Sequence, residues 1–178
     1  ECQRIVIKVG TTTITKADGQ IDLARLEGLA SEALTLRQRG KQVLIVTSGA
    51  VGAGSTKLGL THKPRTVWEK QAAAAVGQAV LMHHYDVAFS KHGLTVAQIL
   101  LTREDVTDRR RYLSARNTIL LLVEMGVVPV INENDTVTSE EIKFGDNDTL
   151  SALVAALVDS DLLILLSDID GLYTGDPR

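Results

Sequence analysis

Two groups of carboxylate and amide side chains lie close together in the second half of the sequence. The first is Asn132-Glu133-Asn134-Asp135, and the second is Gly145-Asp146-Asn147-Asp148. Such side chains can hold an ammonium group, and the N–H groups of a helix N-terminus can hold an anion. The simpler interpretation is that Asp148 caps a helix and that Asn134-Asp135 forms a turn. We favour a binding site, because a turn or a cap needs one such residue and the sequence supplies several.

Apolar segments on either side show how these groups are positioned. Residues 127–131 form an apolar run that predicts a buried strand, although Pro129 within it suggests an edge strand or a bulge. After the second group, apolar residues recur at helical spacing from Leu150 to Val158. A strand therefore ends in the first group, and the second leads into a helix. In open α/β sheets, ligands bind beyond the carboxyl ends of the strands.

The first predicted strand, residues 4–9, carries a lysine near its carboxyl end. Lys8 could point at a bound anion there, and Gly10 would let the backbone approach that anion closely. A lysine in a strand is also often a surface residue with a buried stem. The Gly-Thr-Thr turn that follows favours a phosphate-binding role.

The second predicted strand, residues 43–47, runs into a junction of small residues. Ser48 and Gly49 precede a helix N-terminus whose N–H groups suit a carboxylate or a phosphate, or Ser48 is a plain N-cap. The glycines do not form a Walker A motif, because Ser55-Thr56-Lys57 follows Gly54 where Lys and then Ser or Thr are needed. Their order is also wrong for a dinucleotide-binding fingerprint, which weakens an oxidoreductase interpretation.

Two further strands and three further helices complete the pattern. Residues 94–101 and 162–166 are strand candidates, and the latter delivers Ser167 and Asp168 to the same sheet edge. Helices are expected over 23–39, 65–92 and 109–125. Five apolar strands that alternate with helices predict an α/β fold, a three-layer αβα sandwich with a mostly parallel central sheet. Residues 137–144 could form a flap.

Composition excludes several classes of protein. The 178 residues carry a net charge of −3 without a long basic run, so nucleic-acid binding has little support. No apolar run reaches transmembrane length, which predicts no membrane partner. The single cysteine, Cys2, rules out an internal disulfide and fits a reducing compartment such as the cytoplasm. We expect both ends to be cuts in a longer protein.

With these motifs in place, the chain resembles the amino-acid kinase family, and within it the bacterial branch that phosphorylates the side-chain carboxylate of glutamate. The matching pieces cover nearly all 178 residues. They are Lys8-Val9-Gly10-Thr11, Thr47-Ser48-Gly49-Ala50, the two acidic groups, and Ser167-Asp168 with Gly171-Leu172-Tyr173. Family members continue beyond this length into a Gly-rich segment with a second catalytic lysine. The resemblance therefore implies one amino-acid kinase domain over residues 1–178, truncated at its C-terminus, with the substrate-binding part and the start of the nucleotide-binding part.

The resemblance also implies a reaction and a set of roles. ATP, with Mg²⁺ held by its phosphates and water rather than by a protein metal site, would phosphorylate L-glutamate in the first step of proline biosynthesis. The implied catalytic residues are Lys8 and Asp148. The implied glutamate-binding residues are Ser48, Gly49, Asp135, Asp146 and Asn147. The implied nucleotide-binding residues are Lys8, Gly10, Ser167 and Asp168.

Two alternatives and two partners remain open. N-acetylglutamate kinase, or another kinase that forms an acyl phosphate, is the alternative within the family, although Asp135 suits a free amino group. A non-catalytic module that binds glutamate or proline is the alternative of another class. We expect proline to act as a feedback inhibitor and the protein to be a homo-oligomer, a dimer or a tetramer. The Ala-rich stretch 72–77 is a candidate for the contact between subunits.

Overall fold

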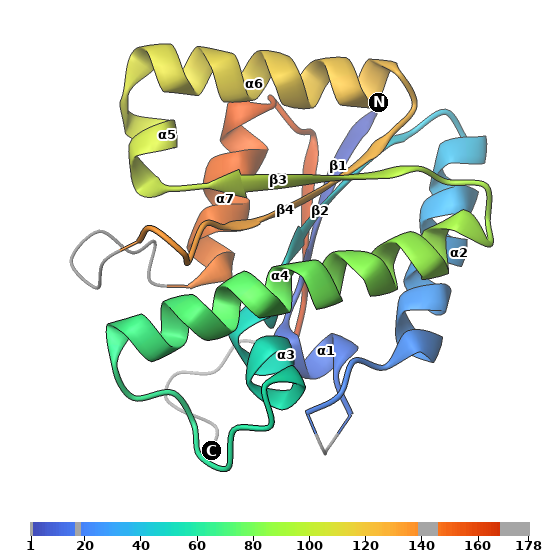
Figure 1. The fold of residues 1–178 in the computed structure, drawn as a ribbon. Coiled ribbons are helices and arrows are strands. Elements are labelled where there is room, and N and C mark those ends of the chain that lie inside the picture. The colour runs from blue at the N-terminus through green and yellow to red at the C-terminus, as the bar shows by residue number, and fades with distance from the viewer. Residues whose placement is uncertain (1, 17–18, 139–145, 168–178) are drawn as a thin grey trace, which may run out of the picture.

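The computed structural model describes residues 2–16, 19–138 and 146–167, and these form a five-stranded sheet in the order β3-β4-β2-β1-β5 (Figure 1). Every pairing of neighbouring strands is parallel. The strands are β1 (Arg4–Val9), β2 (Gln42–Thr47), β3 (Val96–Leu101), β4 (Val128–Glu133) and β5 (Leu162–Leu166). The carboxyl ends of all five strands therefore face the same way, as the sequence predicted.

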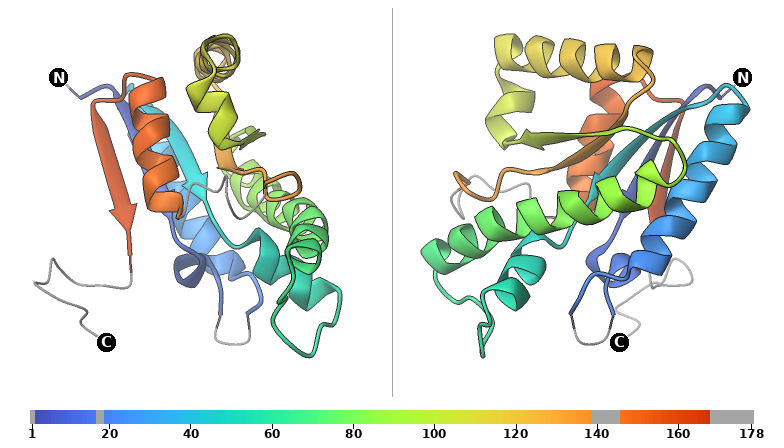
Figure 2. Two further views of the ribbon diagram at one scale, coloured as in Figure 1. Left: turned by 90° about the vertical axis from the view of Figure 1, so that its left-hand side faces the viewer. Right: turned by 45° about the vertical axis from the view of Figure 1, so that its right-hand side comes forward.

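Helices cover both faces of the sheet, which gives the predicted three layers (Figure 2). The helices are α1 (Thr11–Ile14), α2 (Leu23–Gln38), α3 (Ala50–Lys57), α4 (Val67–Ser90), α5 (Arg103–Thr107), α6 (Arg109–Glu124) and α7 (Asn147–Leu157). α2 and α4 pack on one face, and α6 and α7 pack on the other. Alternate residues of each strand point to opposite faces, so both sides of these apolar strands are buried.

The two apolar cores show this alternation within single strands. In β1, Ile5 and Ile7 join the core beneath α2 and α4, whereas Val6 joins the core beneath α6 and α7. In β2, Leu44 is on the α6 and α7 side, and Ile45 is on the α4 side. The sheet is therefore held rigidly from both sides, with its polar carboxyl edge left for binding.

α3 and α4 touch through their backbones. A Cβ added at Gly54 would lie 1.7 Å from the carbonyl oxygen of Ala73, and one at Gly77 would lie 1.7 Å from that of Ala50. Both positions therefore require glycine, which accounts for a glycine in the middle of the long helix α4. The Ala-rich stretch 72–77 thus packs closely against α3 of the same chain.

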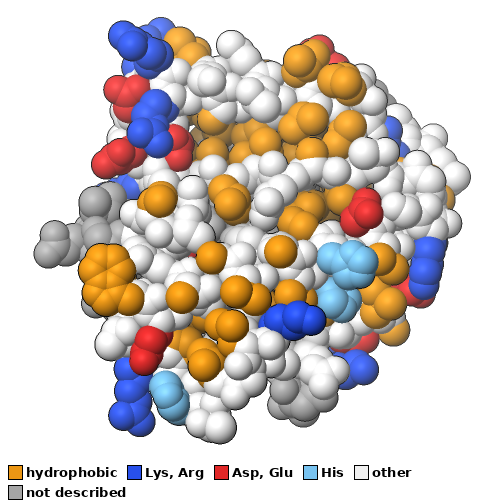
Figure 3. Space-filling view, viewed as in Figure 1, with side chains coloured by type: hydrophobic (Ala, Val, Ile, Leu, Met, Phe, Trp, Pro, Cys, Tyr) orange, Lys and Arg blue, Asp and Glu red, His pale blue; other side chains and the backbone are white. Residues whose placement is uncertain are grey.

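The contact with α3 limits how the stretch 72–77 could contact another subunit. Ala73, Ala74 and Gly77 are buried against the chain itself, whereas Ala72 and Ala75 are exposed. An intersubunit contact through this stretch could use only its outer face. Apolar side chains gather along α4 and over β3 on the face shown in Figure 3.

One detail of the predicted strands is wrong. β4 is an internal strand between β3 and β2, so Pro129 does not mark an edge. The proline is tolerated because the ladder of β4 with β2 begins one residue later, at Val130, and on the β3 side the neighbouring Val128 N–H donates to the Thr95 carbonyl. The connection after β3 contains the short helix α5, which Thr102 begins with a capping box to Asp105.

The other predicted elements are confirmed to within three residues, apart from the suggested flap, which falls mainly on 139–145, outside the described residues. Within the described part of the chain, no helix is both long enough and apolar enough to cross a membrane.

Candidate active site at the carboxyl edge of the sheet

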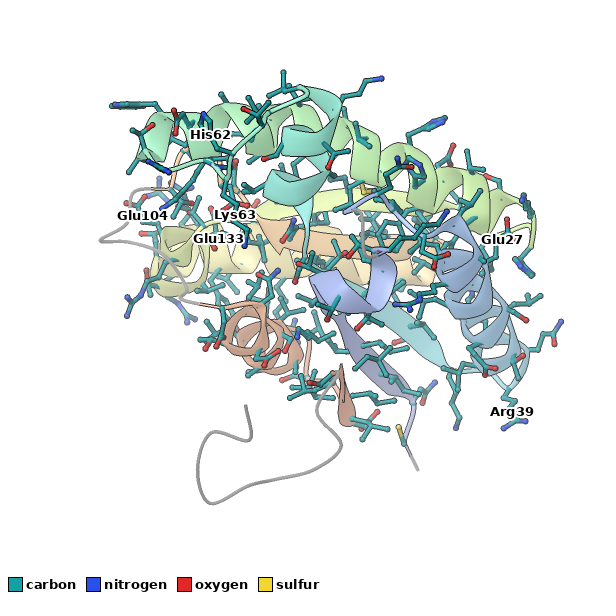
Figure 4. All side chains as sticks on the ribbon, turned by 90° about the horizontal axis from the view of Figure 1, so that it is seen from below. Glu27, Arg39, His62, Lys63, Glu104 and Glu133 are labelled. Atoms are coloured by element: carbon teal, nitrogen blue, oxygen red, sulfur yellow. The ribbon has the colours of Figure 1, made fainter. Side chains whose placement is uncertain are left out.

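A polar cavity of about 280 Å³ lies at the carboxyl ends of β2 and β4. It is lined by backbone and side chains from four segments: Thr11, Ser48 to Gly52, Asn132 with Glu133 and Asp135, and Asp146 with Asn147. Figure 4 views the molecule from below and labels Glu133, the last residue of β4. The cavity is large enough for a small polar metabolite, and it brings together both acidic groups of the sequence.

Asn147 connects the parts of this cavity. Its Nδ2 amide donates to the carbonyl oxygen of Thr47 and to the hydroxyl oxygen of Ser48, each at 2.7 Å, and lies 3.2 Å from Asn132 Oδ1. Asn132 Oδ1 also accepts from the backbone N–H of Glu133 at 2.9 Å. One side chain at the start of α7 therefore ties together the ends of β2 and β4. Because Ser48 accepts from Asn147, its own hydroxyl hydrogen can be donated to a ligand.

The N-terminus of α3 forms one wall of the cavity. Gly49 is the N-cap in a left-handed conformation (φ 98°), and no side chain caps the helix there. The interpretation of Ser48 as a plain N-cap is therefore wrong. Gly49 to Gly52 line the cavity, so the positive end of the helix dipole and its backbone N–H groups border the space that a ligand would occupy. This arrangement suits a carboxylate.

The N-terminus of α7 is capped by Asp146 and not by Asp148. The Asp146 side chain accepts from the backbone N–H of Thr149 at 2.7 Å. That hydrogen bond holds the pKa of Asp146 below its usual value, with smaller contributions from the Thr149 hydroxyl and the charge of Lys8. Asp146 is therefore ionised at neutral pH, and it presents a negative charge at the cavity.

Capping by Asp146 leaves Asp148 for another contact. Its Oδ1 lies 2.7 Å from Lys8 Nζ, in an ion pair between β1 and the first turn of α7. The Lys8 side chain is 14% exposed and that of Asp148 is 52% exposed, so the ammonium group is mostly shielded but reachable. A Cβ at Gly10 would lie 3.4 Å from Lys8 Nζ, so this glycine keeps space beside the charge. A shielded cation with open space suits a phosphoryl group.

Most of the predicted residues converge at this edge. Ser48, Gly49, Asp135, Asp146 and Asn147 line the cavity, and Lys8 pairs with Asp148 beside it. Ser167 directly follows β5 at the carboxyl edge. Asp168 lies outside the described residues, so its predicted contact with a nucleotide stays a prediction.

Sequence reasoning assigned no specific role to three polar residues of the cavity. Asn132 and Glu133 are buried at the end of β4, and Thr11 opens α1. The signal for the first two was their place in the same motif as Asp135, because the last residues of a strand share the site with those that follow it. No comparable signal singles out Thr11 among three consecutive threonines.

The described residues contain no group of three or more His, Cys, Asp or Glu side chains that could hold a metal ion. This part of the chain is compatible with a divalent cation that is bound through a phosphate-bearing molecule and water.

Comparison with known proteins identifies the family. The model of the amino acid kinase family matches residues 3–178. The chain is 59% identical to the glutamate 5-kinase of Moorella thermoacetica over 99% of its own length and 47% of that protein. It is 57% identical to the glutamate 5-kinase of Symbiobacterium thermophilum, with 99% and 68% covered, and 54% identical to that of an Azoarcus species, with 99% and 47% covered. The chain thus spans about half the length of most of these curated relatives. It belongs to the amino acid kinase family, as its motifs indicated.

Proposed function

We propose that these residues are the glutamate-binding part, with the start of the nucleotide-binding part, of an enzyme that transfers the γ-phosphoryl group of ATP to the side-chain carboxylate of L-glutamate. The observation that carries the proposal is the Lys8–Asp148 ion pair beside a cavity lined by carboxylates, amides and helix N–H groups. The product would be glutamyl 5-phosphate, made in the cytoplasm for proline biosynthesis. The similarity to three glutamate 5-kinases supports the same assignment.

The cavity offers complementary groups to each end of glutamate. Asp135 and Asp146 would attract its ammonium group, while Ser48 and the N-terminus of α3 would bind its α-carboxylate. Asn147 would hold these parts at a fixed separation through its bonds to Thr47 and Ser48. The side-chain carboxylate of the substrate would then extend toward Lys8.

Phosphoryl transfer depends on position and on neutralisation of charge. Lys8 would stabilise the negative charge that develops on the transferring group, and Asp148 would orient the ammonium of Lys8. Gly10 and Ser167 would lie against the phosphates, and Asp168 would contact the nucleotide. Mg²⁺, bound through the ATP phosphates and water, would supply further positive charge.

Proline and a second subunit are the expected partners. Proline is a cyclic relative of glutamate with the same α-carboxylate, so we propose that it inhibits by competing for the same cavity. We also propose a homo-oligomer, whose contact would use exposed apolar surface along α4. Sedimentation of the full-length protein tests the second claim, and competition binding between proline and glutamate tests the first.

The decisive experiment is an assay of the full-length protein for acyl phosphate, trapped as the hydroxamate, with ATP and Mg²⁺. We expect turnover with L-glutamate and little with N-acetyl-L-glutamate, because Asp135 and Asp146 favour a charged amino group over an acetamide. Turnover with the acetylated substrate would support the alternative kinase. Tight binding of glutamate without any turnover would support the non-catalytic module.

A further inference from the structure

The inner face of α4 reaches the carboxyl ends of two strands of the cavity, although α4 itself contributes no residue to the cavity lining. Tyr85 is fully buried, and its hydroxyl donates to Thr47 Oγ1 at 2.9 Å. Thr47 is the last residue of β2 and is itself buried. Its hydroxyl lies 3.4 Å from the carbonyl oxygen of Ser48, the next residue and part of the cavity wall.

The bond from Tyr85 sets the direction of the Thr47 hydroxyl. Because Thr47 Oγ1 accepts from Tyr85, its own hydrogen is directed toward the Ser48 carbonyl. The Thr47 carbonyl accepts in turn from Asn147. Tyr85 therefore contacts Thr47, and Thr47 in turn contacts both Ser48 and Asn147. Burial raises the pKa of the Tyr85 phenol above its usual value, and the bond to Thr47 lowers it slightly, so the phenol remains a donor at neutral pH.

Two turns earlier on the same helix, Gln78 makes a similar connection to β4. It is 7% exposed, and its Nε2 lies 3.5 Å from the carbonyl oxygen of Glu133, at the end of β4. Its Oε1 accepts from Gln98 Nε2 of β3 at 3.0 Å, which fixes the orientation of the amide. A buried glutamine among alanines and leucines has an energetic cost unless it is bonded. The contact of Gln78 with the end of β4 accounts for a glutamine at this buried position.

We propose that Tyr85 and Gln78 are positioning residues for the ligand in the carboxyl-edge cavity: α4 holds the ends of β2 and β4 at the separation that the ligand requires. The backbone contact of α4 with α3 fixes a third wall from the same helix. This inference rests on the proposed function for the identity of the ligand, glutamate. By this inference, α4 contributes to the affinity for the ligand although none of its residues lines the cavity.

The test measures glutamate binding by calorimetry and steady-state kinetics in the full-length protein carrying Tyr85→Phe. The change removes one hydroxyl and keeps the ring, so the protein should fold. We expect the glutamate Kd and KM to rise roughly three- to tenfold, the effect of one lost hydrogen bond, with the ATP KM nearly unchanged. Gln78→Leu should also raise the glutamate Kd and KM.

A double-mutant cycle tests the route through Thr47. Thr47→Val removes the hydroxyl that Tyr85 contacts, so the double variant Tyr85→Phe/Thr47→Val should bind glutamate no more weakly than Thr47→Val alone. Thr47→Ser, which keeps the hydroxyl, should bind nearly as the wild type does. Independent, additive losses in the cycle would overturn the proposed route.

Leu81→Val is the matched control, because Leu81 is buried on the same helix between Gln78 and Tyr85 and joins the apolar core. It should lower the thermal midpoint without changing the glutamate Kd. If the wild type binds glutamate and Tyr85→Phe and Gln78→Leu bind it equally well, the inference is wrong and the proposed function stands. If the control weakens binding as much as they do, the effect is one of stability, and the inference is also wrong. A wild type that does not bind glutamate would overturn the proposed function together with the inference.

Discussion

Lys8 Nζ lies 2.7 Å from Asp148 Oδ1, and this ion pair joins the internal strand β1 to the first turn of α7. The two residues are far apart in the sequence and meet because parallel strands deliver their carboxyl ends to one edge. Asp146 serves as the helix cap, and Asp148 pairs with the lysine instead. The ion pair therefore fixes the positive charge of Lys8 beside the cavity that would hold the substrate.

The first prediction concerns Lys8. In the full-length protein, Lys8→Ala should lower kcat by about a thousandfold or more, because the cation is needed most in the transition state, while the glutamate Kd changes little. Stopped-time hydroxamate assays and calorimetry measure the two quantities. Lys91→Ala is the control, since Lys91 pairs with Glu27 on the surface, away from the cavity. A rise in KM at unchanged kcat would make Lys8 a binding residue.

The second prediction concerns recognition of the amino group. Asp135→Asn keeps the shape of the side chain and removes its charge. We expect the KM for glutamate to rise at least tenfold, as when a charged hydrogen-bonding partner is lost, with the KM for ATP nearly constant. An unchanged glutamate KM would exclude contact between Asp135 and the ammonium group.

The third prediction concerns the contact of α3 with α4. Gly54→Ala would place a Cβ 1.7 Å from the Ala73 carbonyl oxygen, so the helices must separate. We expect a loss of about 3 kcal/mol or more in the free energy of unfolding, together with weaker glutamate binding, because α3 forms a wall of the cavity. Gly28→Ala in α2 is the control, since nothing lies within 4 Å of its Cβ; it should stabilise the protein by about 0.5–1 kcal/mol. Denaturant unfolding measures both, and equal effects would contradict the close contact.

These contacts show what the sequence could and could not reveal. Apolar runs and helical spacing predicted the five strands and the long helices, because hydrophobic periodicity directly reports burial. The motifs predicted the convergence at one edge because parallel strands leave no other arrangement. Which acid caps α7 was not predictable: Asp146 and Asp148 are both plausible caps, and the choice depends on Lys8, which lies on another element.

Pro129 was misread for a related reason. A proline weakens a strand only where its N–H would have bonded, and that depends on the register with β2. Tyr85 gave no signal at all, because a tyrosine at helical spacing resembles any core residue until its hydroxyl is seen to meet Thr47.

The fourth prediction concerns pH and the start of the sheet. Asp161, just before β5, accepts from the backbone N–H groups of Gln3 and Arg4, each at 2.7 Å. The bond from Arg4, followed by that from Gln3, holds the pKa of Asp161 below its usual value. The carboxylate therefore contributes stability at neutral pH, and that contribution is lost as the pH falls below about 4 and through the folded-state pKa.

Asp161→Asn should accordingly be less stable than the wild type at pH 7, and the difference should shrink toward pH 2. Denaturant unfolding across this range measures the two curves. Parallel curves would mean that the Asp161 carboxylate is not linked to folding.

The last prediction concerns the 178 residues on their own. β5 is an edge strand of the described sheet, and Leu162 and Leu165 are 43% and 49% exposed on it. An apolar edge of this kind favours pairing with another copy, so we expect the isolated chain to self-associate in sedimentation and Leu165→Lys to reduce the association. The chain spans 47% of the Moorella glutamate 5-kinase. Phosphoryl transfer to a carboxylate brings two anions together, and Lys8 supplies one positive charge, so we expect turnover by these residues alone to be roughly a thousandfold or more below that of the full-length protein. The isolated chain should therefore bind glutamate, whose cavity it contains, more tightly than an ATP analogue, and the hydroxamate assay should detect little acyl phosphate. Turnover close to that of the full-length protein would show that Lys8 and its neighbours suffice for the chemistry.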